Sequence, residues 1–186
     1  YDHQIQGAGF HVAFKRSYNF STMRVGKTGT ALIAMDYLQR VKHYSACLIV
    51  CTVTNMSGVW EDELQKSFPD KKVVLLDGTR EERKEKLKQD ADYYVVNFDG
   101  VKILEKELLE MVKEGVISLC IIDELSHYAN ARTGLWKSMN AVINDKTHPV
   151  EYVVGLTGSP GNSPEPVYAQ SKLITPHNMK MRYTQW

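Results

Sequence analysis

The segment STMRVGKT at residues 21–28 ends like a loop that binds phosphate. Such loops follow the pattern G-x-x-x-x-G-K-[ST]. Here Gly26, Lys27 and Thr28 complete the pattern, whereas Ser21 stands where the first glycine belongs. The glycine lets the backbone approach a phosphate, the lysine reaches the β- and γ-phosphates, and the hydroxyl binds Mg²⁺. A helix start without a ligand explains the same three residues, so on their own they leave both interpretations open.

A second segment, LCIIDELS at residues 119–126, places two carboxylates where an apolar run ends. Adjacent acids at a partly desolvated strand exit repel each other, and a bound cation relieves that repulsion. With a phosphate loop upstream, Asp123 would hold Mg²⁺ and Glu124 would polarise an attacking water. An Asp-Glu helix cap is the simpler alternative. The presence of Gly-Lys-Thr in the same chain favours the metal and catalytic roles.

Short apolar runs alternate with helix-like segments around these two motifs. The runs that predict strands are Ser17–Phe20, Ala46–Cys51, Val73–Leu76, Tyr93–Val96, Leu119–Asp123 and Tyr152–Leu156. Apolar stripes at helical spacing comprise Ala31, Met35, Leu38 and Val41, then Trp60, Leu64 and Phe68, then Leu104, Leu108, Met111 and Val112. Continuous apolar strands separated by helices indicate an α/β fold, with a mostly parallel sheet covered by helices on both faces. Ligands of such sheets bind beyond the carboxyl ends of the strands, which is where both motifs fall.

Composition sets broad limits. A chain of 186 residues, 43% hydrophobic and 24% charged, fits one globular domain. The formal net charge of +1 means that nucleic-acid binding would need a local patch. Three cysteines in apolar runs predict reduced core residues in a cytosol-like compartment. The charged run at residues 80–88 predicts a solvated helix face, and Trp60 and Trp136 are expected in the core or at an interlobe surface.

Six segments in order resemble the N-terminal RecA-like lobe of superfamily-two helicases and translocases, most closely the Swi/Snf-type DNA translocases and their phage-encoded relatives. The segments are DHQ (2–4), MRVGKT (23–28), LIVCT with VWEDEL (48–64), VVNFDG (95–100), IDELSHYAN (122–130) and LTGSPGNSP (156–164). They span nearly the whole chain. In this family a residue other than glycine commonly takes the place of Ser21, so the resemblance favours a genuine phosphate loop.

The resemblance implies one RecA-like ATP-binding lobe over residues 1–186, of three-layer α/β/α architecture. It implies ATP and Mg²⁺ as cofactors and hydrolysis as the reaction. The second RecA-like lobe of such motors, which supplies arginines to the nucleotide, is absent from the chain, so the chain is expected to be a partial protein with weak ATPase activity. The implied location is the cytoplasm or the nucleoid (the host cytoplasm if phage-encoded), with no membrane association.

The resemblance also implies a role for individual residues. Lys27, Asp123 and Glu124 are the expected catalytic residues, with Thr28 and Asp123 at Mg²⁺. Gln4 would read adenine, and the expected loop contacts to the nucleotide are Met23, Arg24, Val25, Gly26, Lys27 and Thr28. DNA contacts are expected on the opposite rim, to the backbone of duplex DNA and independent of sequence, from Thr52, Asn97, Thr157, Gly158 and Ser159.

Two residues depart from the family pattern. Arg24 stands where a further glycine is common, and it either helps hold the nucleotide or points to solvent. Ser126 replaces the histidine that couples nucleotide state to the Thr-Gly-Ser segment, so coupling is expected to differ. These departures keep open a catalytically degenerate lobe that binds DNA or protein. An unrelated P-loop NTPase or kinase is the third alternative, although the chain has no guanine-reading Asn-Lys-x-Asp motif.

Overall fold

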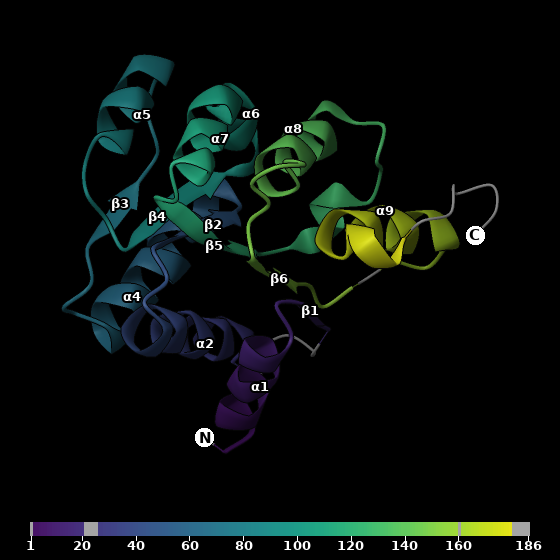
Figure 1. The fold of residues 1–186 in the computed structure, drawn as a ribbon, viewed down its shortest axis with the longest axis horizontal. Helices are drawn as coiled ribbons and strands as arrows, with labels where there is room; N and C mark the ends of the chain where they lie inside the picture. Colours follow the sequence, from purple (N-terminus) through teal and green to yellow (C-terminus); the bar gives the residue numbers. More distant parts are fainter. Residues whose placement is uncertain (1, 21–25, 160, 180–186) are drawn as a thin grey trace.

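The computed structural model describes residues 2–20, 26–159 and 161–179 (Figure 1). Its centre is a six-stranded sheet in the order β1-β6-β5-β2-β4-β3, and every pairing is parallel. The strands are β1 (Arg16–Asn19), β2 (Ala46–Cys51), β3 (Val73–Leu75), β4 (Tyr93–Asn97), β5 (Ile117–Ile122) and β6 (Tyr152–Leu156). Because parallel strands share a direction, all carboxyl ends lie at one edge of the sheet, as the two sequence motifs require.

Helices cover both faces of the sheet (Figure 1). The helices of the first half are α1 (Asp2–Ala13), α2 (Lys27–Lys42), α3 (Val53–Asn55), the π-helix η1 (Met56–Glu61), α4 (Asp62–Ser67) and α5 (Arg80–Leu87). Those of the second half are α6 (Phe98–Ile103), α7 (Glu105–Lys113), the 3-10 helix η2 (Leu125–Tyr128), α8 (Gly134–Ile143), α9 (Pro164–Ile174) and the 3-10 helix η3 (Pro176–Asn178). Helices α2 and α4 lie on one side and α6 to α9 on the other, with α1 packed against α2. The predicted three-layer α/β fold is confirmed.

The central strand β2 illustrates why the apolar runs are continuous. Its six residues are all buried. Ala46, Leu48 and Val50 face the core beneath α6 to α9, while Cys47, Ile49 and Cys51 face the core beneath α2 and α4. Successive side chains of a strand point to opposite faces, so a strand covered on both sides must be apolar throughout. The cysteines are free and buried, as predicted.

Three local predictions need correction. Val41 is 52% exposed, because ten residues after Ala31 an α-helix has turned about 80° away from the start of the stripe. The stripe containing Trp60 is not one α-helix: it is divided between η1 and α4, and Phe68 caps the latter. Strand β5 begins at Ile117, two residues before the predicted start at Leu119, because Ile117 already pairs with Ala46 of β2.

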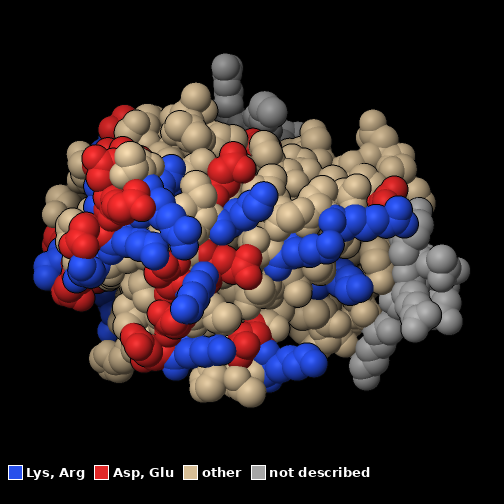
Figure 2. Space-filling model, turned by 90° about the horizontal axis from the view of Figure 1, so that it is seen from above, with Lys and Arg blue, Asp and Glu red and all other residues tan. Residues whose placement is uncertain are grey.

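The charged helix α5 is solvated, as predicted, with no residue buried. Its lysines pair with nearby acids, including Lys84 with Glu107 and Lys86 with Asp77. On the face seen in Figure 2, acidic and basic side chains are interspersed. Surface pairs of this kind contribute about 0–1 kcal/mol each. In the part of the chain that the structure describes, no helix has both the length and the apolar character needed to cross a membrane.

Candidate nucleotide and DNA site

Gly26 opens helix α2 in the left-handed conformation, with φ 79°. Its carbonyl accepts hydrogen bonds from the backbone N–H of Thr30 at 2.9 Å and from the Thr30 hydroxyl at 3.0 Å. Lys27 and Thr28 occupy the first turn, which contains no acidic residue. The N-terminal N–H groups and the positive end of the helix dipole therefore meet no carboxylate of that turn, as an anion site requires. The predicted loop residues Met23, Arg24 and Val25 lie outside the described residues.

Gln4 lies against the end of this loop, although it is 22 residues away in sequence. Its amide nitrogen donates to the Gly26 carbonyl at 3.4 Å, and a Cβ added to Gly26 would lie 2.2 Å from that nitrogen. Helix α1 is anchored to β1 by a 2.7 Å hydrogen bond between His11 Nδ1 and the Ser17 hydroxyl. Burial lowers the pKa of His11 to about 4, so the ring is neutral at pH 7. The predicted adenine-reading residue and the phosphate loop are thus neighbours.

The strand order sets how far apart the two motifs lie. The loop that ends at Gly26 follows β1, the doublet Asp123-Glu124 follows β5, and only β6 lies between those strands. Neighbouring strands are about 4.8 Å apart, which separates the ends of β1 and β5 by about 10 Å. A magnesium-bound triphosphate can span that gap. The sheet therefore brings the two predicted halves of the site to one edge.

The Asp123 carboxylate is held by three neutral donors. Its Oδ2 accepts from the Trp60 indole N–H at 3.0 Å and from the Asn55 amide at 3.3 Å, and its Oδ1 accepts from the Glu124 backbone N–H at 3.0 Å. Its own N–H donates to the Val50 carbonyl at 2.8 Å, which ties the residue to β2. Among the described residues no cation pairs with this carboxylate. Within the described part of the chain, its negative charge is therefore oriented but not neutralised.

Glu124 adopts a left-handed backbone, with φ 51° and ψ 55°, at the start of η2. For a residue with a Cβ this conformation costs about 1–2 kcal/mol. Strain of this kind is retained where the surroundings enforce it, often at functional sites.

Cys51, which lies near Asp123, carries no charge, because burial and then the negative charge of Asp123 raise the pKa of its thiol to about 12.

The residues predicted to contact DNA lie at the same carboxyl edge. Thr52 follows β2, Asn97 ends β4, and Thr157 begins the segment after β6. Thr157 is buried, and its N–H donates to the Asn19 carbonyl at 3.1 Å. Residues 157–159 were predicted on the rim opposite the nucleotide motifs. That placement is wrong, because these residues follow β6, which lies between β1 and β5. Gly158 and Ser159 follow there, and the Ser159 N–H donates to the Thr157 hydroxyl at 3.1 Å.

Asn97 is fixed by an arginine from the run that was expected to form a solvated face. The Asn97 amide oxygen accepts from Arg83 Nη1 at 2.9 Å, and the same nitrogen donates to the Leu76 carbonyl at 2.6 Å. A Cβ on Gly100 would lie 2.4 Å from Arg83 Nη1, so this close packing needs a glycine. Arg83 therefore turns its side chain toward the Gly78 and Leu76 carbonyls and the buried Asn97 amide, and the spacing of the run gave no signal of these contacts.

Ser126 is half-buried in η2, one residue before an exposed histidine. The ring of His127 stacks on Phe98 with centroids 4.3 Å apart, which connects η2 to the start of α6. Leu125 packs against β6: a Cβ on Gly155 would lie 2.7 Å from its Cδ2. Short contacts therefore join the acidic doublet to the strand that leads to Thr157. The coupling role of Ser126 stays a prediction.

The chemistry of these groups fits ATP and Mg²⁺. The left-handed glycine and a first helical turn without an acidic residue suit a phosphate, and the hydroxyl of Thr28 and the carboxylate of Asp123 are the oxygen ligands that Mg²⁺ prefers. Among the described residues no group of three or more His, Cys, Asp or Glu side chains is placed to hold a metal ion. A magnesium ion at this site would therefore depend on the nucleotide phosphates for further ligands.

Comparison with known proteins gives one family and one fold. The family model described as "Type III restriction enzyme, res subunit" matches residues 22–162, well over half of the chain. The fold is similar to that of the Sulfolobus solfataricus SWI2/SNF2 ATPase core in complex with dsDNA, with a TM-score of 0.76 and 17% identity over 98% of this chain. The chain covers 37% of the length of that protein chain. No curated protein matches the sequence.

Proposed function

The chain belongs to the family of type III restriction enzyme res subunits, and from this premise we propose that it is the ATP-binding lobe of a DNA-dependent motor. The predicted membership of the superfamily-two helicases, as a RecA-like N-terminal domain, is confirmed, whereas the phage origin stays a prediction. One observation supports the proposal most: Gly26 in its left-handed conformation and the Asp123-Glu124 doublet lie two strands apart at one sheet edge.

The proposed roles follow from the chemistry of each group. Lys27 and the N–H groups that open α2 neutralise the phosphates, and Gln4 reads the adenine edge. Mg²⁺, when bound, neutralises charge on the β- and γ-phosphates. Thr28 and Asp123 hold it, and Glu124 orients the attacking water. Electrostatic stabilisation of this kind usually contributes more to catalysis than any other single effect.

We propose that DNA binds at the same edge through its backbone. Thr52, the Asn97 turn and the 157–159 segment offer hydroxyls and N–H groups, which contact phosphates without reading sequence. The structural relative from Sulfolobus solfataricus was solved with dsDNA, which supports duplex DNA as the partner here. A second RecA-like lobe would complete the motor, since an arginine supplied from another domain can contribute about 10³–10⁵ in rate.

The proposal is tested by filter binding of labelled ATP and GTP to the wild-type chain and the Lys27→Ala variant. The expected result is a preference for ATP over GTP and a loss of ATP affinity of about 100-fold in Lys27→Ala, because a phosphate-facing charge is removed. A preference for GTP would indicate a different kind of P-loop protein.

Turnover distinguishes an active lobe from a degenerate one. ATP hydrolysis should be measured with duplex DNA and a second RecA-like lobe supplied, in wild type and in Lys27→Ala. DNA-stimulated hydrolysis by the wild type alone supports the motor. Equally slow hydrolysis by both proteins would favour a lobe kept only for binding DNA or protein.

A further inference from the structure

We propose that Trp60 and Asn55 are positioning residues that set the Mg²⁺ affinity of the nucleotide site by orienting the Asp123 carboxylate. This inference rests on the proposed function of that site. The supporting contacts are the two hydrogen bonds that Asp123 Oδ2 accepts, from the Trp60 indole at 3.0 Å and from the Asn55 amide at 3.3 Å. Because each side chain donates to Asp123 Oδ2, each acts on the site through Asp123.

Counting lone pairs shows what these bonds do. An ionised carboxylate offers about four acceptor positions, two on each oxygen. The Trp60 and Asn55 donors take both positions on Oδ2, and the Glu124 N–H takes one on Oδ1. Among the described residues nothing occupies the last position, on Oδ1. The carboxylate is therefore held in one rotamer with a single acceptor for a metal ion or its water.

Both donors are themselves well held. Trp60 is fully buried in the core beneath α2 and α4, so its ring cannot swing away from Asp123. It lies in the π-helix η1, whose following residue, Asp62, bonds through its N–H to the Ser57 carbonyl five residues back. Single π-turns of this kind occur frequently at functional sites. The backbone of Asn55 is fixed by its own N–H, which donates to the Thr52 carbonyl at 3.1 Å.

Packing alone does not account for this arrangement. A buried tryptophan needs a partner for its N–H, and a backbone carbonyl is sufficient. Trp136 demonstrates this: it is also buried, and its indole N–H donates to the Ala169 carbonyl at 2.9 Å. Trp60 instead donates to a carboxylate at the predicted metal site, from 63 residues away in sequence. Donors that orient a metal-binding carboxylate typically change metal affinity by 10–100-fold when removed.

The test compares Trp60→Phe with Trp136→Phe, which lose the same N–H and keep an aromatic ring. Binding of a fluorescent N-methylanthraniloyl ATP is measured at increasing Mg²⁺ concentration and in EDTA, without any turnover. Trp60→Phe is expected to raise the Mg²⁺ concentration at half-maximal effect about tenfold, with binding in EDTA unchanged. Trp136→Phe is expected to leave both quantities at their wild-type values.

Each result has one meaning. Equal Mg²⁺ midpoints in Trp60→Phe, Trp136→Phe and wild type would overturn the inference, as would an equal loss of binding with and without Mg²⁺ in Trp60→Phe. If Trp60→Phe fails to fold by circular dichroism, Asn55→Ala decides, with an expected midpoint two- to threefold above wild type because its bond is longer. If wild-type binding shows no Mg²⁺ dependence, the proposed metal site itself fails, and that outcome is visible before any variant is compared.

Discussion

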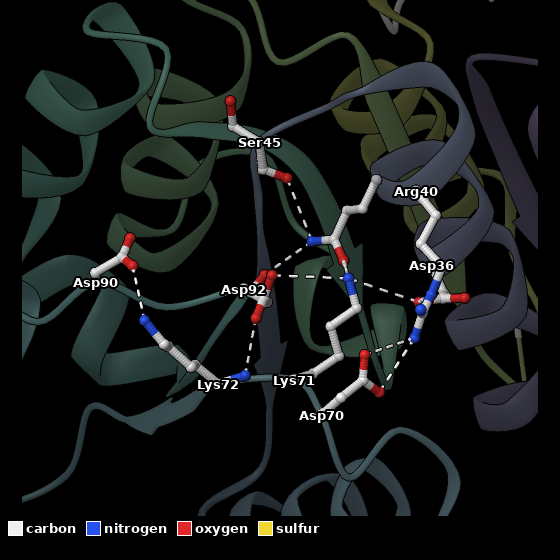
Figure 3. Close-up of polar contacts among 9 residues, drawn as sticks. Asp36, Arg40, Ser45, Asp70, Lys71, Lys72, Asp90 and Asp92 are labelled. Carbon is white, nitrogen blue, oxygen red and sulfur yellow. Dashed lines mark hydrogen bonds and ion pairs between the residues drawn. The ribbon is translucent and has the colours of Figure 1, made fainter.

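The amino edge of the sheet and the carboxyl ends of β1 and β5 differ in how their charged side chains are paired. At the amino edge, before β2, β3 and β4, acidic and basic side chains neutralise one another (Figure 3). Lys71, whose side chain is 9% exposed, donates to the Gln39 amide oxygen at 3.0 Å and pairs with Asp36 at 3.6 Å and Asp92 at 3.7 Å. Arg40 pairs with the same Asp36 at 2.7 Å. Each charged side chain drawn in Figure 3 therefore has a partner of opposite charge.

Among the described residues, the carboxyl ends of β1 and β5 are arranged differently. Asp123 is oriented by neutral N–H donors, the first turn of α2 carries no acid, and Glu124 is held in a strained backbone. A carboxylate that already has a cationic partner has little to offer a metal ion, whereas one held by amides and an indole keeps its full charge. This contrast supports the proposal that the amino edge stabilises the fold and that the carboxyl ends of β1 and β5 bind a ligand. Three substitutions examine that distinction.

The largest expected effect is on turnover. Glu124→Gln should lower DNA-stimulated ATP hydrolysis by about 10²–10⁴, because a positioned general base is lost, while ATP affinity stays unchanged. Hydrolysis is measured with the second lobe supplied. Glu114→Gln, the same change at the amino edge, is the matched control and should keep wild-type turnover. Hydrolysis in Glu124→Gln equal to that of this control would remove Glu124 from the mechanism.

The second-largest expected effect is a loss of stability caused by a substitution at the amino edge. Lys71→Met should lower the free energy of unfolding by about 1–3 kcal/mol, because Gln39 and two carboxylates lose a largely buried partner. Urea denaturation measures the change. Lys72→Met is the control: Lys72 pairs with Asp90 at 3.1 Å, but the two side chains are 67% and 90% exposed, so at most about 0.5 kcal/mol is expected. An equal loss in the two variants, or a loss of ATP affinity in Lys71→Met, would break the comparison between the edges.

The smallest expected effect is a gain in stability, opposite in sign to that of Lys71→Met. Glu124→Gly should raise the free energy of unfolding by about 1 kcal/mol, since glycine adopts positive φ without the steric cost of a Cβ. Hydrolysis should be lost at the same time. His43→Gly at the end of α2, where φ is 58°, is expected to stabilise similarly and to leave ATP binding intact. A destabilised Glu124→Gly would mean that the backbone at residue 124 is not strained.

Much of this architecture could be predicted from local pattern. The run Ala46–Cys51 was predicted with both ends correct, because a strand buried on both faces leaves an unbroken apolar signature. The ends of strands were predicted less reliably where pairing with a neighbouring strand decides them, as at Ile117, which begins β5. The helix containing Trp60 was predicted as one piece, since periodicity does not distinguish a π-helical turn from an α-helical one. The hydrogen bond from Arg83 to Asn97 was not predicted, because the sequence of a charged run is the same whether all its side chains face solvent or one of them contacts the protein interior.

The α/β class, the parallel sheet, and the placement of a Gly-Lys-Thr loop and an Asp-Glu doublet after strands follow from the amino-acid sequence without any coordinates. These features depend on residue type and short spacing, which the chain carries locally. The folded chain was needed to learn that β6 lies between β1 and β5, that the Gln4 amide contacts Gly26, and that Trp60 donates to Asp123. Such contacts depend on strand order, helix packing and rotamers, and those are set by the assembled core as a whole.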